Sequence, residues 1–493
     1  YDFNTVAGTL ITRSYRSCYT LYTILMPISS GEVFAVLKGK MRSVLTPLWK
    51  SGQISPARVI LYGFLLLILL GTGLLMLPFS TREWGGAPFS DALFTATSAT
   101  CVTGLVIHDT AGYWSGFGQL VILLLIQVGG MGVVTMAVAV FMFSGKRIGL
   151  KQRWVMQESI AAPQMGGIVR MTCFILKTAF AIEGAGAAAL ALRFCPEFGL
   201  WQGLWYAVFH AISAFCNAGF DLMGVKAPFS SLTGYIGDPV VNLTIMLLIV
   251  VGGLGFLTWR DIFTHCFRFR EYRLQSKLIL TATAALLLFG FLFFLLYEFR
   301  LPQWAGMTLG EKVLAAMFQS VTPRTAGFNT VELTRMSEPA QLLTILLMLT
   351  GGSPGSTAGG FKTTTLAVLL LSAAAVFRKR REAQCFGRRV QDGVLQNACA
   401  IFMLYALFFL AGGILICAID QVPLMDALFE AASAIGTVGL SLGGTARFSL
   451  ASRMILIFLM YFGRVGGLTL IYAVVAGNGT SASQFPQEQV TVG

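Results

Sequence analysis

Charged residues are scarce in this sequence, and their scarcity indicates which solvent the chain faces. They make up 12% of 493 positions, whereas hydrophobic residues make up 56% and the mean hydropathy is +0.74. A soluble globular chain carries about 25% charged residues. Most of this chain's surface must therefore face something other than water, and we expect an integral membrane protein.

Residues that serve catalysis and metal binding are also few. There are three His residues, scattered along the chain, and none of the nine Cys residues forms a CxxC pair. No Ser-His-Asp, Cys-His or paired-carboxylate arrangement appears. We therefore expect neither an enzyme nor a cofactor held by this chain. The net charge of +13 does not indicate nucleic acid, because the basic residues lie in short clusters between apolar runs.

Long apolar runs are what the sequence has in abundance. A helix needs about 20 residues to cross ~30 Å of hydrocarbon. Eight runs are long enough, at residues 57–79, 116–144, 167–194, 239–264, 275–299, 338–376, 394–419 and 449–476. Basic clusters follow the second, fourth and sixth runs, and the positive-inside rule assigns such connections to the cytoplasm. Eight spans then put both termini in the cytoplasm.

The first forty residues match this pattern poorly. They lack the ordered regions of a signal peptide, and Met41 begins a basic lead-in to the first run. We expect residues 1–40 to be either an extension outside the native chain or an amphipathic arm.

A half-length apolar segment ending in a Gly loop follows each odd-numbered run. The four segments read DALFTATSATCVTGL (91–105), YAVFHAISAFCNAGF (206–220), AAMFQSVTPRTAGF (315–328) and DALFEAASAIGTVGL (426–440). In each, a Phe is followed four residues later by Ser or Thr, and then by a Gly. The third segment is one residue shorter between Phe and Gly, so its loop entry should differ.

Repetition at a near-constant spacing indicates one structural unit used several times. We predict an all-α membrane protein in which four units of helix, re-entrant pore helix, loop and helix surround a central pore, giving eight transmembrane helices plus four re-entrant loops. The repeats cover residues 57–144, 145–264, 265–376 and 377–476, between a cytoplasmic segment at 1–56 and a cytoplasmic tail at 477–493.

Four Gly loops at membrane depth suggest a filter for a cation. Irregular backbone is tolerated there only inside protein or along a watery cavity, and backbone carbonyls can replace the hydration shell of an ion. Glycine accepts the turn and leaves no Cβ in the passage. The predicted filter, with K+ at the carbonyls around its glycines, comprises Val102, Thr103, Gly104, Leu105, Asn217, Ala218, Gly219, Phe220, Thr325, Ala326, Gly327, Phe328, Thr437, Val438, Gly439 and Leu440.

Neighbouring polar residues are assigned supporting roles. Thr95, His210, Gln319 and Glu430 follow the repeated Phe, and their variety favours packing or loop anchoring behind the filter. We expect Arg324 to brace the third loop through its carbonyls.

These segments resemble a known family. CVTGL (101–105), FHAISAFCNAGFDL (209–222), SVTPRTAGFNT (320–330) and GTVGLSLG (436–443) are similar to the filters of the Ktr/Trk/HKT potassium-transporter superfamily, above all to the membrane subunit of the bacterial Ktr system. The resemblance implies potassium uptake across a bacterial plasma membrane by a homodimer with one pore per subunit. It also implies a cytoplasmic ring of regulatory subunits that bind ATP or ADP, and sodium activation is a further possibility within the family. A Gly at all four filter positions, Gly104 included, goes with potassium selectivity.

The sixth run is interrupted by a polar, Gly-rich stretch that cannot remain helical against lipid. The resemblance implies an intramembrane gating loop, formed by Gly351, Gly352, Ser353, Pro354, Gly355, Ser356, Thr357, Ala358, Gly359 and Gly360. Arg464 in the eighth run either holds this loop and opposes a cation, which we favour, or pairs with a neighbouring helix end. The stretch only imitates a phosphate-binding loop, because Phe361 stands where that motif requires Lys.

Two other classes of membrane protein share some of these features. A sodium- or proton-coupled solute carrier also uses broken helices, but it is usually built from two large inverted halves. A membrane enzyme would need a catalytic cluster that the sequence lacks. Potassium-dependent growth would favour the channel-like protein, and accumulation of an organic solute would favour the carrier.

Overall fold

The computed structural model describes residues 56–137, 149–160, 167–266, 268–380, 382–391 and 393–467. The expected N-terminal segment, apart from Pro56, and the tail at 477–493 lie outside the described residues. The described residues all belong to one compact unit, which begins at Pro56.

The first helix of each repeat is long and apolar. These helices are α3 (Pro56–Leu75), α9 (Ile168–Phe198), α13 (Leu274–Leu296) and α17 (Val394–Asp420). Among the described helices, these four are by themselves long and apolar enough to cross a membrane, and the chain buries only 28–39% of their most apolar stretches. Leu66 and Leu70 are examples of the apolar side chains left exposed. Such a surface suits lipid rather than water.

The predicted re-entrant segments are short helices in the interior. They are α4 (Phe89–Thr100), α10 (Leu200–Phe215), α14 (Leu309–Val321) and α18 (Leu424–Gly436). At 1.5 Å per residue they are too short to span the hydrocarbon layer. Each packs against the first helix of its own repeat. The repeated Phe explains this position, because Phe94, Phe209, Phe318 and Phe429 are at most 1% exposed.

The second helices differ from the sequence prediction. They are α6 (Gly116–Met131), α11 (Pro239–Gly253) with α12 (Phe256–His265), α15 (Glu338–Leu349) with α16 (Thr363–Phe377), and α19 (Leu450–Val465). Only the break between α15 and α16 was expected.

The expectation of one continuous span at 239–264 was wrong, and the helices that begin the runs at 116–144 and 449–476 end at Met131 and Val465. Gly132, Gly255 and Gly466 stand at the ends of α6, α11 and α19 with φ of 88°, 88° and 90°. A glycine with a positive φ and an extended ψ lies outside the helical conformation, so the regular helical hydrogen bonding ends there. The chain then leaves α11 at an angle of 98° to enter α12. Residues 138–144 and 468–476 of the first and last of these spans lie outside the described part of the chain.

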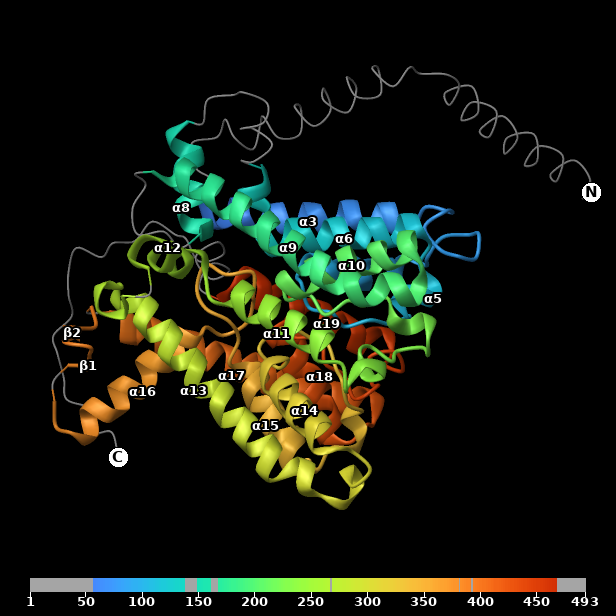
Figure 1. Cartoon of the computed structure of the whole chain (residues 1–493). Helices are drawn as coiled ribbons and strands as arrows, with labels where there is room; N and C mark the ends of the chain where they lie inside the picture. The colour runs from blue at the N-terminus through green and yellow to red at the C-terminus, as the bar shows by residue number, and fades with distance from the viewer. Residues whose placement is uncertain are drawn as a thin grey trace, which may run out of the picture. The chain divides into compact units, whose positions relative to one another are not determined.

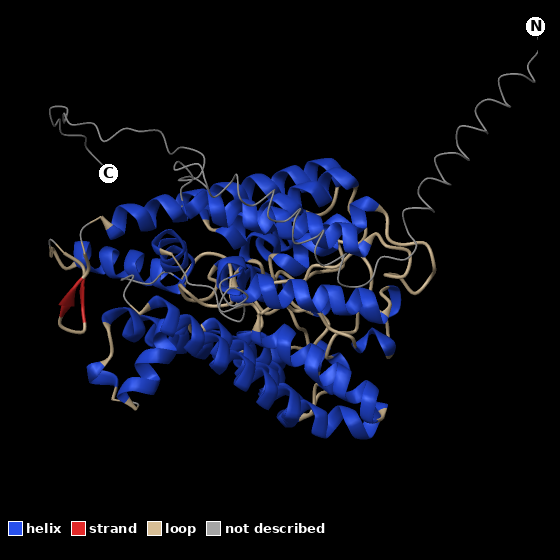
Figure 2. Ribbon diagram, turned by 90° about the horizontal axis from the view of Figure 1, so that it is seen from above, coloured by secondary structure: helices blue, strands red, loops and turns tan. Residues whose placement is uncertain are grey.

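The four repeats close on one another. The second helix of each repeat packs against the pore helix of the next, in the pairs α6 with α10, α11 with α14, and α15 with α18; α19 then returns to α4. The Tyr461 hydroxyl in α19 also donates to the Leu61 carbonyl in α3, at 2.7 Å. Figure 2 shows non-helical segments running between the helices in the middle of this arrangement.

Smaller elements lie at the two ends of the helices. Near one end are α8 (Leu150–Ile160), α12 and an antiparallel hairpin of β1 (Gln384–Cys385) and β2 (Arg388–Arg389), and near the other is α5 (Thr110–Tyr113) (Figure 1). Within the described residues there are six short 3₁₀ helices, η1 (Met223–Val225), η2 (Thr233–Tyr235), η3 (Phe269–Glu271), η4 (Glu298–Arg300), η5 (Pro302–Trp304) and η6 (Leu333–Arg335).

Candidate functional site: a ring of four glycine loops

The four predicted loops meet in cyclic order. A Cβ added to any of their glycines would come within 3.0 Å of a carbonyl oxygen on another repeat. The contacts run from Gly104 to Ala218, from Gly219 to Ala326, from Gly327 to Val438 and from Gly439 back to Thr103. Each carbonyl belongs to the residue just before the next glycine. The loops therefore form a closed ring of four equivalent segments.

Each loop has the same unusual backbone. The glycines have φ between 70° and 95°. Two positions earlier, Val102, Asn217, Thr325 and Thr437 have φ between 52° and 66°. A side chain in the left-handed region costs roughly 1–2 kcal/mol, so surrounding contacts must hold these residues in place.

The repeated Ser or Thr supplies such contacts. Ser98 and Ser433 accept hydrogen bonds from the amides of Gly104 and Gly439, at 3.1 and 3.0 Å. Ser213 and Thr322 instead donate to the carbonyls of Phe220 and Phe328, at 2.7 and 2.5 Å. These hydroxyls lie at the ends of the pore helices, so each helix fixes the loop that follows it.

The third loop differs at its entry, as its length predicted. In repeats one, two and four, the amide before the glycine donates to the carbonyl five residues back, as Thr103 does to Ser98 at 2.8 Å. In repeat three, Ala326 donates to Thr322, four residues back, at 3.0 Å. The missing residue is thus absorbed by a tighter turn.

The positions after the repeated Phe anchor the outgoing chain in two repeats. His210 accepts from the amide of Leu222 at 3.4 Å. Glu430 accepts from Ser441, at 2.5 Å, and from Thr445, at 2.6 Å. Gln319 is 1% exposed and its amide has no hydrogen-bond partner among the described residues.

The four glycines share one cavity. Gly104, Gly219, Gly327 and Gly439 all line a cavity of about 870 Å³, whose other walls come from the loops that follow the filters and from residues 303–307, which precede α14. Its charged lining residues are Asp109, Asp221, Glu332, Arg335 and Arg447. The ring therefore opens into a space large enough for water on the side of the outgoing loops.

Asp221 is the carboxylate nearest in sequence to a filter glycine. Its Oδ1 accepts from the amide of Met223 at 3.0 Å. Burial raises the pKa of Asp221 from 3.8 to about 7, and the charge of Asp109 adds to the rise. Its charge consequently changes within the physiological range of pH.

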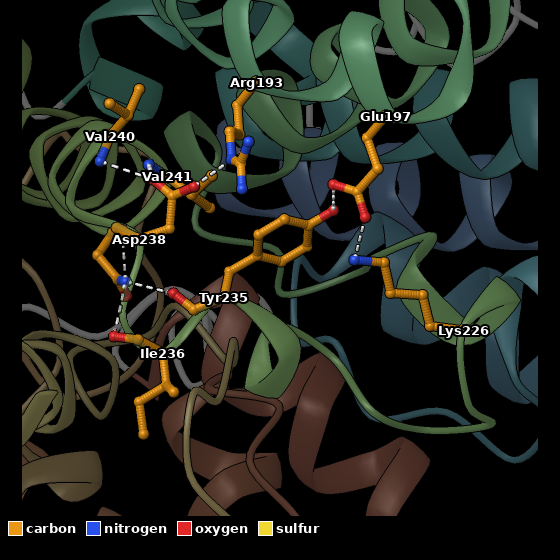
Figure 3. A network of polar contacts seen from close by, with 9 residues as sticks. Arg193, Glu197, Lys226, Tyr235, Ile236, Asp238, Val240 and Val241 are labelled. Carbon is orange, nitrogen blue, oxygen red and sulfur yellow. Dashed lines mark hydrogen bonds and ion pairs between the residues drawn. The ribbon is translucent and has the colours of Figure 1, made fainter. Parts of the chain in front are cut away.

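A polar network holds the outgoing loop of repeat two (Figure 3). Asp238 caps α11 and pairs with Arg193 at 2.5 Å, while the Tyr235 hydroxyl donates to Glu197 at 2.8 Å. Lys226 pairs with Glu197, and its Nζ lies 4.1 Å from the centre of the Tyr235 ring. These contacts tie one wall of the cavity to α9.

The predicted gating loop packs against the second helices and the fourth filter loop. Its backbone pairs with the ends of two second helices, through Ser353 to Gly253 at 3.0 Å and Gly360 to Gly463 at 3.1 Å. Thr357 donates to the Phe215 carbonyl, at 3.0 Å, at the end of the second pore helix. A Cβ on Gly359 would come within 3.0 Å of Thr437 in the fourth filter.

Arg464 joins the gating loop to another repeat. Its guanidinium donates to the carbonyl of Thr357, and also to those of Gly129 and Gly130, at 2.5 and 2.9 Å. The two glycines belong to the last turn of α6. Arg464 thus makes the contacts that both predicted roles require. Its bond to Thr357 holds the gating loop, and its bonds to Gly129 and Gly130 cap the end of α6.

Lys362 was missed by the sequence reasoning. Its Nζ donates back to the carbonyls of Ala358 and Gly359, at 2.8 and 3.1 Å. The available signal was a Lys placed directly after a membrane break, but it was interpreted only as part of a failed phosphate-binding motif. Lys362 closes the gating loop on itself.

The expected role of Arg324 needs correction. Its guanidinium donates to the Thr283 hydroxyl of α13 at 3.3 Å, rather than to loop carbonyls. Its buried Nε has no partner among the described residues. Only its own carbonyl takes part in the ring, by accepting from Asn217 at 3.3 Å.

The chain is similar to known cation transport proteins. Residues 64–479 match the TrkH family, described as cation transport proteins. The potassium/sodium uptake protein NtpJ of Enterococcus hirae is 39% identical over 90% of this chain and 98% of its own length. The Ktr system potassium uptake protein B of Bacillus subtilis is 39% identical over 90% of this chain and 97% of its own length.

A solved structure shares the fold. The crystal structure of the potassium transporter TrkH from Vibrio parahaemolyticus superposes with a TM-score of 0.68, over 94% of this chain and 96% of that one. The two sequences are 19% identical, so this likeness concerns the fold alone.

Proposed function

This chain belongs to the TrkH family of cation transport proteins, and from that premise we propose that it takes up potassium through the ring of four glycine loops. As a member it is a multi-pass membrane transporter and not an enzyme. The relatives named for potassium or potassium/sodium uptake support the choice of ion. A carrier of organic solutes does not fit a family that transports cations.

The observation that carries the proposal is the cyclic contact of the glycines. Each filter glycine faces the carbonyl of the residue before the next one, and all four line a single cavity. A dehydrated cation needs several oxygen ligands at once, and a closed ring of backbone carbonyls supplies them. No carboxylate has to enter the bilayer for this purpose.

Gating in this proposal belongs to residues 351–360 with Arg464. The loop lies behind the second and fourth filters, so an ion leaving the ring inward must displace it. Arg464 stabilises the closed position by holding Thr357 to α6 and places a positive charge on the ion's path. Lys362 holds the same loop by donating to the carbonyls of Ala358 and Gly359.

The proposal extends to assembly and control. We propose a homodimer with one pore per subunit and both termini in the cytoplasm of a bacterial cell. A cytoplasmic regulatory ring binds ATP or ADP, whereas this chain holds no nucleotide. The relationship to proteins of the Ktr system and the basic connections between repeats support these expectations. The proposal also includes activation of uptake by sodium.

Growth of a bacterial strain that lacks its own potassium uptake tests the function. The strain expressing this chain, together with a Ktr-type regulatory subunit, is expected to grow at low potassium in proportion to the protein in its membrane. The Gly327→Asp variant, expressed to the same level, is the matched control and should not support growth. Failure of the wild type to move potassium or sodium, despite correct insertion, would overturn the proposal.

A further inference from the structure

We propose that the cytoplasmic connections on either side of repeat three carry a binding site for the headgroups of anionic phospholipids. The site is a surface called here the basic platform, formed by α12, the turn before α13 and the β1–β2 hairpin. Its residues are Arg260, Phe263, Arg268, Phe269, Arg270, Phe386 and Arg388.

The basic platform lies at the boundary of the membrane. The bend of 98° at Gly255 turns α12 away from the direction of α11, so that α12 runs across the end of the helices. Arg273 is the N-cap of α13, a helix long and apolar enough to span the membrane. The turn before it therefore lies at the level of the headgroups. In Figure 1, α12 and the hairpin lie at the same end of the molecule as the start of α13.

The charge of the platform is strongly positive. Arg260, Arg268, Arg270 and Arg388 are all exposed. Of the neighbouring carboxylates, Glu271 lies 3.5 Å from Arg268. Asp261 is buried and already accepts from Ser276 at 2.7 Å, with Arg273 3.7 Å away. The surface thus offers several guanidinium groups to an anion, and juxtamembrane clusters of this kind attract anionic lipid.

Aromatic rings lie among these charges. Phe263, Phe269 and Phe386 are 63%, 37% and 44% exposed. The rings of Phe269 and Phe386 meet edge to face with 5.7 Å between centres, which joins the turn before α13 to the hairpin before α17. Exposed Phe is unfavourable in water but suits the boundary between headgroups and acyl chains.

The apolar surface continues from the platform onto the lipid side. β1 contacts α16, and α16 ends in Val376 and Phe377, which are 69% and 86% exposed. Arg378 follows them directly. This order of exposed apolar and then basic residues matches a membrane interface, and it favours lipid over a soluble protein as the occupant.

Lipid binding to the purified full chain in neutral detergent tests the proposal. Native mass spectrometry would count bound phosphatidylglycerol and phosphatidylcholine separately, at about 50 and about 500 mM salt. The wild type should prefer phosphatidylglycerol, and high salt should weaken that preference. In the R260Q/R270Q variant, binding should fall roughly tenfold or more, because each basic residue near an anionic surface contributes to the attraction.

The matched control removes equal charge from the start of repeat two. Arg153 in α8 and Arg170 in the first turn of α9 are exposed and lie outside the basic platform, so R153Q/R170Q should bind phosphatidylglycerol as the wild type does. The separate change Phe386→Ser should weaken binding without altering the charge.

Two results would overturn the proposal. One is a wild type that binds the two lipids equally at low salt, a test that requires no variant. The other is an R260Q/R270Q variant that keeps lipid binding but no longer retains a nucleotide-binding regulatory subunit, which would make the surface a protein interface. Neither result depends on which ion the pore conducts.

Discussion

At the scale of single residues, each filter position requires glycine for two independent reasons. Gly219 has a φ of 70°, and a Cβ there would come within 3.0 Å of the Ala326 carbonyl oxygen. The first requirement is local to the backbone, and the second comes from the neighbouring repeat. Sequence periodicity predicted the glycines, but it carried no information about which repeat each one touches.

Replacing Gly219 with Ala should therefore abolish most potassium uptake. The added methyl forces the second and third loops apart, and the left-handed backbone costs roughly another 1–2 kcal/mol. Tracer uptake into cells at equal expression measures the effect, with an expected loss of about tenfold or more. Gly73→Ala is the control, because an added Cβ at Gly73 meets nothing within 4 Å. Equal uptake by the two variants would contradict close contact around the ring.

Asp221 should make uptake depend on external pH. Because burial raises its pKa to about 7, the carboxyl group is neutral below that pH and charged above it. A charged group beside the outer cavity concentrates cations, so uptake should fall roughly two- to threefold as external pH drops from about 8 to about 6.

The Asp221→Asn variant should show a flatter pH profile, with uptake near the acidic value of the wild type. Glu332→Gln neutralises another carboxylate that lines the same cavity, and it should leave the pH dependence in place. An unchanged profile in the Asp221 variant would assign the pH response to other groups.

At the scale of elements, hydropathy predicted the first helices and the pore helices closely. It predicted only one of the breaks in the second helices, because the hydropathy of an apolar run is the same whether or not a glycine within it adopts a positive φ. The paired glycines before Met131 and Leu254 were visible in the sequence. Their effect becomes clear only from the loops that pack against them, as when Gly253 accepts a hydrogen bond from Ser353.

The gating loop should open when its internal or external bonds are removed. Deleting Gly355–Gly359, or changing Arg464 to Gln or Lys362 to Met, removes contacts that hold the loop behind the filters. Each change should raise potassium uptake without the regulatory subunit by about threefold or more, since two or three charge-assisted hydrogen bonds are lost.

Uptake measured with and without the regulatory subunit checks this prediction. Lys177→Met removes an exposed Lys from α9 and should leave both rates unchanged. A properly inserted Arg464→Gln protein with wild-type uptake and regulation would show that Arg464 serves the helix end alone.

At the scale of the whole molecule, the repeats explain both what sequence could predict and what it could not. The four segments in register predicted that the repeats share an axis. The contacts between neighbouring repeats, from α6 with α10 round to α19 with α4, form a closed ring about such an axis. The difference between Arg324, which bonds to α13, and Arg464, which bonds to α6, lay beyond sequence reasoning. Both are intramembrane arginines, and only the position of neighbouring carbonyls distinguishes them.

The central claim is that four equivalent loops select potassium, and ion selectivity tests it most directly. Purified wild type and Gly104→Ser would be reconstituted side by side, and potassium and sodium flux measured separately in each. We predict that the wild type favours potassium and that the Ser variant admits sodium, because its side chain displaces the Ala218 carbonyl from the ring. A Ser variant with unaltered selectivity, in a protein that still conducts, would contradict selection by the four loops.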